Sequence, residues 1–176
     1  MKTHMQGQVI WLMGLSGSGK STLADALAET LRQSGQSKVY RLDGDTLRDG
    51  LNSDLGFQQQ DRDENLRRAA HVARLFAEEG YIVIASFISP LESQRQMIRS
   101  QFSIGQYNEV WLSTPLTVCE QRDPKGLYRK ARQGLIPEFT GIDSAFETPE
   151  HCDLVLNTET QAVPESVRAL TRELKL

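Results

Sequence analysis

The stretch GLSGSGKST, residues 14–22, decides the fold. It matches the pattern G-x-x-x-x-G-K-[ST], in which a glycine-rich turn is followed by a lysine and a hydroxyl residue. The apolar run VIWLM, residues 9–13, precedes it, and residues 20–33 carry apolar side chains at helical spacing. A strand, a glycine-rich turn and a helix in this order predict a loop that binds nucleotide phosphates. A glycine-rich turn with a purely structural role is the alternative.

Each part of this loop has a chemical task. Glycines allow backbone N–H groups to converge on phosphate oxygens without a Cβ in the way, and the positive end of the following helix attracts the same anion. The lysine can reach the β- and γ-phosphates, and the hydroxyl that follows it can bind Mg²⁺. We therefore expect ATP to be bound by Gly14, Leu15, Ser16, Gly17, Ser18, Gly19, Lys20, Ser21 and Thr22.

Short apolar runs alternate with longer runs of helical periodicity along the rest of the chain. We expect strands at residues 9–13, 38–43, 81–87, 108–113 and 153–158, and helices at residues 20–33, 63–80, 89–102, 115–122 and 164–176. Strands that are apolar along their whole length are typical of parallel sheets covered on both faces. The pattern predicts one α/β domain over residues 1–176, a P-loop NTPase fold with a parallel five-stranded sheet and helices on both faces.

Composition excludes several classes of protein. The net charge of −3 offers no general basic surface for nucleic acid or a membrane. The N-terminus has no long apolar run with a cleavage site, and the apolar runs elsewhere are too short to span a bilayer. We expect a soluble, cytoplasmic protein. Cys119 and Cys152 lack metal-ligand spacing, so two inert thiols are expected, with a redox pair as the alternative.

Residues 123–149 differ from the rest of the chain. Basic residues lie there among glycines and prolines, and no strand pattern is visible. A compact domain rarely keeps so long an irregular stretch unless it serves as a lid or a binding loop. We expect a basic lid at this position.

Three classes of P-loop protein compete. A GTPase would need the guanine-reading pattern [NT]-K-x-D, which does not occur in this chain. A motor or an ATPase would usually have an acid closing a strand, and the strand expected at residues 81–87 ends without one. A small-molecule kinase needs an acid near the acceptor hydroxyl, a second anion site and a mobile basic lid. The chain offers all three.

The acid lies in the segment after the second expected strand. Asp43 and Asp45 follow this strand, at the edge where open α/β sheets bind ligands. Asp45 can accept the proton of an attacking hydroxyl, or orient that hydroxyl through Mg²⁺. The alternative is that Asp45 is the N-cap of a short helix, and both roles can hold at once.

The second anion site is predicted near residues 48–65. Arg62 and Asn65 are three residues apart at an expected helix start, so they share a face beside the positive end of the helix dipole. Together with Arg48 they can clamp a phosphate or a sulfate. A solvated, charged first turn is the alternative. Phe57 either stacks on a base or fills the core.

Six segments make a family resemblance specific. GLSGSGKST, DGDTLR, DLGF with DRDENLRR, FISP, CEQRDPKGLYRKAR and FTGID follow one another as in the adenylylsulfate kinase (APS kinase) family, and they cover most of residues 9–150. The resemblance implies phosphorylation of the 3′-hydroxyl of adenosine 5′-phosphosulfate (APS) by MgATP. The product would be 3′-phosphoadenosine 5′-phosphosulfate (PAPS), an intermediate of sulfate assimilation.

The resemblance also implies roles for individual residues. Lys125 would reach the ATP phosphates from the lid, and Ser21 and Asp45 would hold the metal. Lys20, Asp45 and Ser89 would be catalytic, with Asp45 nearest the reacting hydroxyl. The acceptor would be held by Asp43, Asp45, Arg48, Phe57, Arg62, Asn65, Ile88, Ser89, Phe139 and Thr140. A homodimer is implied as well.

The serine of FISP becomes phosphorylated in some relatives. For Ser89 the sequence offers another explanation, because it can cap the helix expected at residues 89–102, with Pro90 at the first helical position and Glu92 completing a capping box.

The chain departs from the family pattern in and around the expected lid. Leu91, Glu92, Ser113, Leu135 and Pro137 replace residues that are common in relatives. These departures leave two alternatives open: a sister kinase that acts on another nucleotide-linked acceptor, and a nucleotide-binding regulatory module without activity.

Overall fold

The structure, a computed structural model, describes residues 7–176. The domain expected over residues 1–176 and the interpretation of the N-terminus both extend into residues 1–6, which lie outside this description. The strands are β1 (Gln8–Met13), β2 (Val39–Asp43), β3 (Ile82–Phe87), β4 (Tyr107–Leu112) and β5 (Leu154–Leu156). They form one sheet in the order β2-β3-β1-β4-β5, and every neighbouring pair is parallel. The five-stranded parallel sheet is therefore confirmed.

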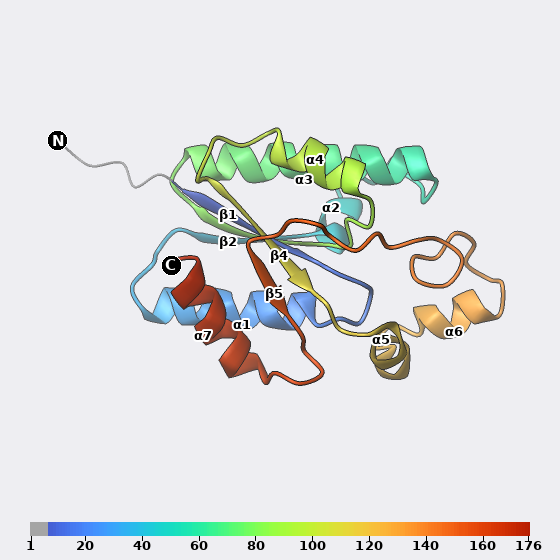
Figure 1. Cartoon of the computed structure of the whole chain (residues 1–176). Coiled ribbons are helices and arrows are strands. Elements are labelled where there is room, and N and C mark those ends of the chain that lie inside the picture. Colours follow the sequence, from blue (N-terminus) through green and yellow to red (C-terminus); the bar gives the residue numbers. More distant parts are fainter. Residues whose placement is uncertain (1–6) are drawn as a thin grey trace.

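The helices connect these strands. They are α1 (Lys20–Gln33), α2 (Gly44–Arg48), α3 (Gln59–Glu78), α4 (Glu92–Arg99), α5 (Leu116–Arg122), α6 (Leu127–Arg132) and α7 (Val163–Glu173). Figure 1 shows α3 and α4 on one face of the sheet and α1 and α7 on the other. Within residues 7–176, no helix is both long enough and apolar enough to cross a bilayer.

The central strand β1 explains why both faces are covered. Its side chains alternate between two cores: Val9, Trp11 and Met13 pack under α3 and α4, whereas Ile10 and Leu12 pack against α1 and α7. All five side chains are fully buried. Because the apolar run has no polar face, the strand requires a helix layer on each side.

The sheet brings three predicted segments to one edge. The phosphate loop follows β1, α2 follows β2, and residues 88–90 follow β3. These three strands are adjacent and parallel, so their carboxyl ends lie side by side. This is the edge at which open α/β sheets bind ligands.

The start of α4 differs from the expectation. Ser89 has a backbone φ of 47° and does not cap the helix. The helix begins at Glu92 instead, and the Leu91 N–H donates to Gln94 Oε1 at 3.2 Å. The predicted capping box of Ser89 and Glu92 is therefore wrong, because the chain bends back at Ser89 before the helix can begin.

The observed starts of helices α2 and α3 change the interpretation of the site. Asp43, not Asp45, caps α2, since its Oδ1 accepts from the Thr46 N–H at 2.9 Å. The expected N-cap role of Asp45 is therefore wrong, and its carboxylate is left exposed in the first turn. The helix expected from residue 63 begins at Gln59, which places Arg62 in the first turn and Asn65 in the second.

The segment expected to be an irregular lid contains α6. Asp123 holds the start of this helix: its Oδ1 accepts from the Tyr128 N–H at 3.0 Å and its Oδ2 from the Arg129 N–H at 3.1 Å. Burial opposes it, but these backbone hydrogen bonds lower the pKa of Asp123. From residue 133 to 149 the described lid has no helix or strand beyond a single bridge between Thr140 and Ser144.

Candidate active site

The phosphate loop has the backbone conformation that the glycines predict. Gly17 and Gly19 have φ angles of 75° and 96°, which residues other than glycine rarely adopt. A Cβ on Gly17 would also lie 2.9 Å from the Cys119 carbonyl oxygen. Within residues 7–176, the N–H groups of Leu15, Ser16, Gly17 and Gly19 donate to no protein acceptor. The loop thus presents free donors, as an anion-binding nest requires.

Lys20 lies inside this loop. Its Nζ donates to the carbonyl oxygens of Gly14 at 2.8 Å and Leu15 at 2.7 Å. Burial, the largest cause, and the ammonium group of Lys125 lower the pKa of Lys20 to about 8, against the opposing effects of Cys119 and Asp45. A phosphate bound beside Nζ would stabilise the ammonium form of Lys20 and raise its pKa again.

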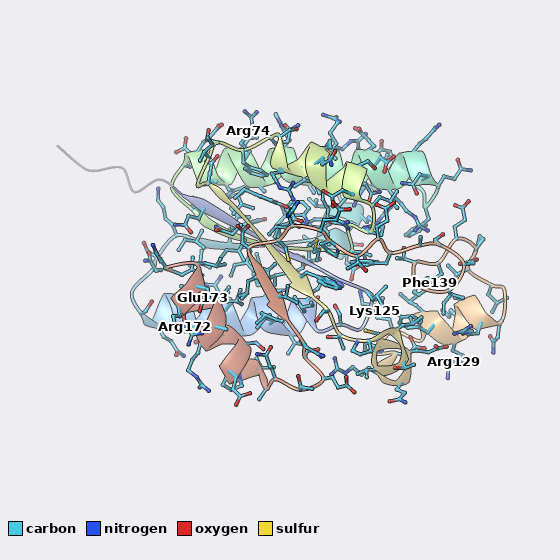
Figure 2. All side chains as sticks on the ribbon, in the orientation of Figure 1. Arg74, Lys125, Arg129, Phe139, Arg172 and Glu173 are labelled. Carbon is cyan, nitrogen blue, oxygen red and sulfur yellow. The ribbon has the colours of Figure 1, made fainter. Side chains whose placement is uncertain are left out.

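Asp45 forms an ion pair with Lys125, which joins α2 to the lid across 80 residues of sequence. Both side chains are mostly exposed to solvent. Lys125 lies at the lid end of the molecule, as Figure 2 shows. Because both charges act on the pKa of Lys20, the predicted acid, the lid cation and the lysine predicted to bind phosphate lie within electrostatic reach of one another.

Arg48 and Arg62 lie close together. Burial, and after it the neighbouring charge of Arg62, lower the pKa of Arg48. Arg48 Nη1 donates to the carbonyl oxygens of Leu55 at 3.1 Å and Gly56 at 2.9 Å. Arg62 Nε donates to the next carbonyl, that of Phe57, at 2.7 Å. The charges of Asp61 and Asp45 raise the pKa of Arg48 in opposition, and a pair of guanidinium groups at this place suits an anionic ligand.

Arg62 connects α3 to the lid. Its Nη2 donates to the Glu138 carbonyl at 2.6 Å, and its Nη1 donates to Thr140 Oγ1 at 3.3 Å. Thr140 is buried and its neighbour Phe139 is nearly so. The two lid residues that the resemblance implied therefore lie beside a predicted anion-binding arginine.

Phe57 is an exposed aromatic ring and not part of the core. Its side chain is 68% exposed, and the guanidinium of Arg48 lies 4.4 Å from the ring centre. The core alternative for Phe57 is wrong, and an exposed ring at this place suits stacking on a base. Asn65 is buried, and its Oδ1 accepts from Asn52 Nδ2 at 2.9 Å, so its own amide N–H groups remain available.

Residues 88 and 89 lie behind the phosphate loop. The Ile88 carbonyl accepts from the Gly14 N–H at 3.3 Å. Ser89 is buried, and its Oγ accepts from Trp11 Nε1 at 2.9 Å. A cavity of about 490 Å³ lies nearby against Leu15, between the loop and lid residues 141–146.

Sequence reasoning missed three residues that support this site. Trp11 looked like an ordinary core residue, although its indole holds Ser89. Asn52 orients Asn65, and Tyr128 joins α6 to the phosphate loop through a hydrogen bond to the Ser16 carbonyl. A buried tyrosine or asparagine always needs a partner, but the sequence does not say which one.

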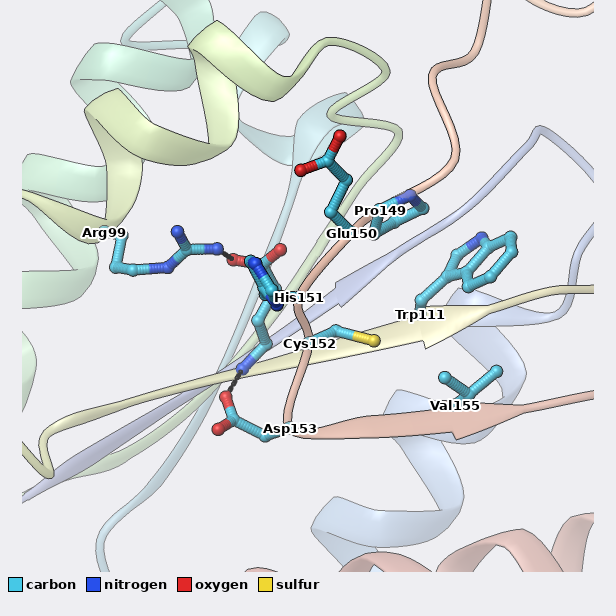
Figure 3. A pocket seen from close by; sticks show the side chains of 9 residues that line it. Arg99, Trp111, Pro149, Glu150, His151, Cys152, Asp153 and Val155 are labelled. Carbon is cyan, nitrogen blue, oxygen red and sulfur yellow. Dashed lines mark hydrogen bonds and ion pairs between the residues drawn. The ribbon is translucent and has the colours of Figure 1, made fainter.

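A second cavity, of about 410 Å³, contains none of the predicted site residues (Figure 3). It lies beside β4 and the start of β5. Its buried acid, Glu109, accepts from Arg99 Nη2 at 2.7 Å, yet burial still raises the pKa of Glu109. Cys152 lines this cavity, whereas Cys119 is buried near the phosphate loop. Both thiols are free, and burial raises the pKa of both, as inert thiols require.

The fold and the site together define a P-loop kinase. A family model described as adenylylsulphate kinase matches residues 6–157. This chain therefore belongs to the adenylylsulphate kinase family.

Similar proteins agree with this assignment. A probable adenylyl-sulfate kinase of Bacillus subtilis is 54% identical over 157 residues, which cover 89% of this chain and 79% of the relative. The APS kinase CysC of Mycobacterium tuberculosis, solved in complex with AMPPNP and APS, superimposes with a TM-score of 0.92 at 45% identity over 97% of this chain and 99% of that one. A hexameric APS kinase from Thiobacillus denitrificans gives a TM-score of 0.74 at 30% identity, over 98% of this chain and 29% of that longer one.

Proposed function

We propose that this protein transfers the γ-phosphoryl group of ATP to the 3′-hydroxyl of APS, giving PAPS and ADP in sulfate assimilation. One observation supports the proposal: the exposed carboxylate of Asp45 acts on Lys20 of the phosphate loop, and the same short helix α2 carries Arg48, which lies near the charge of Arg62 and 4.4 Å from the ring centre of Phe57. Family membership supports the identity of the acceptor.

The donor half holds the triphosphate. The free N–H groups of the loop and the ammonium group of Lys20 offset the charge of the β- and γ-phosphates. The 3′-oxygen attacks the γ-phosphorus, the bond to the β–γ bridging oxygen breaks, and Asp45 or water accepts the hydroxyl proton. Such a transfer depends on positioning and charge neutralisation more than on covalent chemistry.

The residues at the site also fit Mg²⁺. Ser21, in the first turn of α1, and Asp45 both present exposed oxygen atoms. Residues 7–176 contain no cluster of three or more metal-ligating side chains, but Mg²⁺ at a phosphate usually takes only one or two protein ligands. When bound, the ion neutralises charge that develops on the transferred phosphoryl group.

The acceptor half binds the second nucleotide. Arg48 and Arg62 hold the 5′-phosphosulfate, and Phe57 and Phe139 pack on the adenine. Asp45 orients the 3′-hydroxyl toward the γ-phosphorus. The remaining predicted contacts come from Asp43, Asn65, Ile88, Ser89 and Thr140.

Ser89 has a buried hydroxyl that already accepts a hydrogen bond from Trp11. This contact supports a role in lining the acceptor pocket, and it speaks against a phosphorylated serine, because a phosphate would need space and solvation there. A catalytic role of Ser89 remains a prediction without a supporting contact.

The lid, residues 123–149, closes over both nucleotides. Its Lys125 meets Asp45, and residues near Thr140 meet Arg62, so the lid contacts the acceptor half at two points. Closure brings the lid cation to the ATP phosphates and excludes water, which limits futile hydrolysis.

Two further properties belong to this proposal. The protein works as a homodimer, as the family resemblance implies, although a relative forms a hexamer. It works in the cytoplasm, where ATP is available and free thiols such as Cys119 and Cys152 stay reduced.

The test is ADP release measured with MgATP alone and after addition of APS. We expect ADP release to depend on APS, with PAPS as the second product. A sister kinase would release little ADP with APS and would release ADP readily when another nucleotide-linked acceptor replaced APS. A regulatory module would bind ATP and release no ADP with any acceptor, and this result would contradict the proposal.

A further inference from the structure

The first five carbonyl oxygens of the phosphate loop are held by side chains. Five consecutive carbonyls, from residue 14 to residue 18, accept hydrogen bonds from five side chains. The donors are Lys20 for residues 14 and 15, Tyr128 for residue 16 at 2.8 Å, Arg122 for residue 17 at 3.4 Å, and Thr158 at 2.8 Å and Thr114 at 3.4 Å for residue 18. This part of the loop is therefore held by a side chain at five consecutive carbonyls.

A held carbonyl also determines where the next N–H group points. In a planar trans peptide the C=O and the following N–H point in opposite directions. The hydrogen bond from Tyr128 to the Ser16 carbonyl therefore turns the Gly17 N–H away from Tyr128. Gly17 has a positive φ, and its N–H has no protein acceptor within residues 7–176.

Tyr128 differs from the other donors because it belongs to the lid. It lies in α6, and its side chain is 1% exposed. Its ring meets the ring of Phe139 edge-on, with centroids 5.0 Å apart. One buried side chain thus contacts the donor loop through its hydroxyl and a predicted acceptor residue through its ring.

A merely structural role of Tyr128 would not require this particular hydrogen-bond partner. A buried tyrosine hydroxyl needs a hydrogen-bond partner, and any carbonyl of the scaffold would satisfy it. The partner here is the peptide whose orientation sets a phosphate-binding N–H group. Burial raises the pKa of Tyr128 far above neutrality, so the hydroxyl remains a donor at any assay pH.

We propose that Tyr128 is a positioning residue that links the lid to the donor site: while α6 is seated, its hydroxyl holds the Ser16 carbonyl and aims the Gly17 N–H at the ATP phosphates. The proposal rests on ATP as the donor of the proposed function, and it does not depend on the identity of the acceptor.

The test is the substitution Tyr128→Phe, which removes only the hydroxyl and keeps the ring against Phe139. The affinities of AMPPNP with Mg²⁺ and of APS are measured separately by calorimetry, together with both KM values. We expect nucleotide affinity to fall about threefold to tenfold, the usual effect of one hydrogen bond, and APS affinity to stay unchanged.

A matched control is Tyr107→Phe in β4. Tyr107 is also largely buried, and its hydroxyl donates to Glu109 Oε2 at 3.4 Å, among the residues around the second cavity and away from the phosphate loop. We expect this variant to keep wild-type affinity for both ligands. The melting temperatures of both variants show whether a general loss of stability accounts for any change.

Two results would overturn the proposal: wild-type nucleotide affinity in Tyr128→Phe, or an equal loss of affinity for both ligands. Failure of the proposed function would look different. In that case the wild-type protein would not phosphorylate APS, while the comparison of nucleotide binding would still decide the role of Tyr128.

Discussion

The donor and acceptor halves of the site are built in different ways. In the donor half the carbonyls of residues 14–18 are held by side chains, and within residues 7–176 the N–H groups of Leu15, Ser16, Gly17 and Gly19 have no protein acceptor. In the acceptor half, two of the groups predicted to bind the ligand already have protein partners. Asp45 pairs with Lys125, and Arg62 donates to the Glu138 carbonyl and to Thr140.

The difference teaches how each half gains its ligand. The donor loop can accept phosphate oxygens without changing its backbone, so its binding energy is not spent on rearrangement. The acceptor groups must exchange a protein partner for the ligand or share it with the ligand. The net gain in free energy from such an exchange is small for each hydrogen bond. We infer that acceptor binding is coupled to movement of the lid, because the lid supplies the partners that are exchanged.

The largest effect is expected at the donor half. Lys20→Ala removes the charge beside the β- and γ-phosphates, and we expect turnover to fall by about 10³-fold, measured as APS-dependent ADP release. Since the hydrogen bonds that Lys20 Nζ makes within residues 7–176 all go to its own loop, the melting temperature without ligand should stay close to wild type. Turnover within about tenfold of wild type would contradict the role of Lys20.

Asp45→Asn tests the acid at the boundary of the two halves. The amide keeps the shape of the side chain but cannot accept the hydroxyl proton, so we expect kcat to fall by about 10²-fold or more. Affinity for ATP, measured by calorimetry, should be retained. Near-normal kcat would remove the role assigned to Asp45, whatever happened to its ion pair with Lys125.

Arg62→Ala separates the acceptor half from the donor half. It removes a guanidinium from the predicted phosphosulfate site, and we expect the KM for APS to rise about tenfold or more. The KM for ATP should change little, because the guanidinium of Arg62, within the described part of the chain, donates to Phe57, Glu138 and Thr140 and to no residue of the phosphate loop. An equal rise of both KM values would contradict a clamp for the acceptor alone.

The pH dependence of ATP binding sharpens the account of the donor half. Without ligand the pKa of Lys20 is lowered to about 8, and bound phosphates raise it. Between pH 8 and the pKa in the complex, binding therefore takes up a proton, and ATP affinity falls as pH rises, by at most about tenfold per unit. Calorimetry at pH 9 in buffers of different ionisation enthalpy measures this uptake. Release of a proton on ATP binding, or no proton exchange at all, would contradict the lowered pKa of Lys20 in the free protein.

The fold and the donor half were predictable because their signals are local. Apolar runs such as residues 9–13 predict buried strands. The glycines within residues 14–22 predict a backbone conformation that other residues rarely adopt. The carboxyl ends of adjacent parallel strands then place the Asp45 segment at the same edge without further information.

The remaining parts depend on contacts between distant residues. Ser89 sits in a sequence typical of a helix cap, yet Trp11, 78 residues away, holds its hydroxyl in a bent segment. Two aspartates stand at the start of α2, and only the three-dimensional turn shows that Asp43 is the cap. Tyr128 lies in a short helix among glycine and proline, where periodicity carries no signal.

The most direct test of the central claim is a crystal structure with AMPPNP, Mg²⁺ and APS bound together. The account predicts a phosphate loop with an unchanged main chain, while Lys125 leaves Asp45 for the phosphates and Arg62 exchanges the Glu138 carbonyl for the phosphosulfate. A rearranged phosphate loop, or APS bound with both of these protein contacts intact, would contradict it.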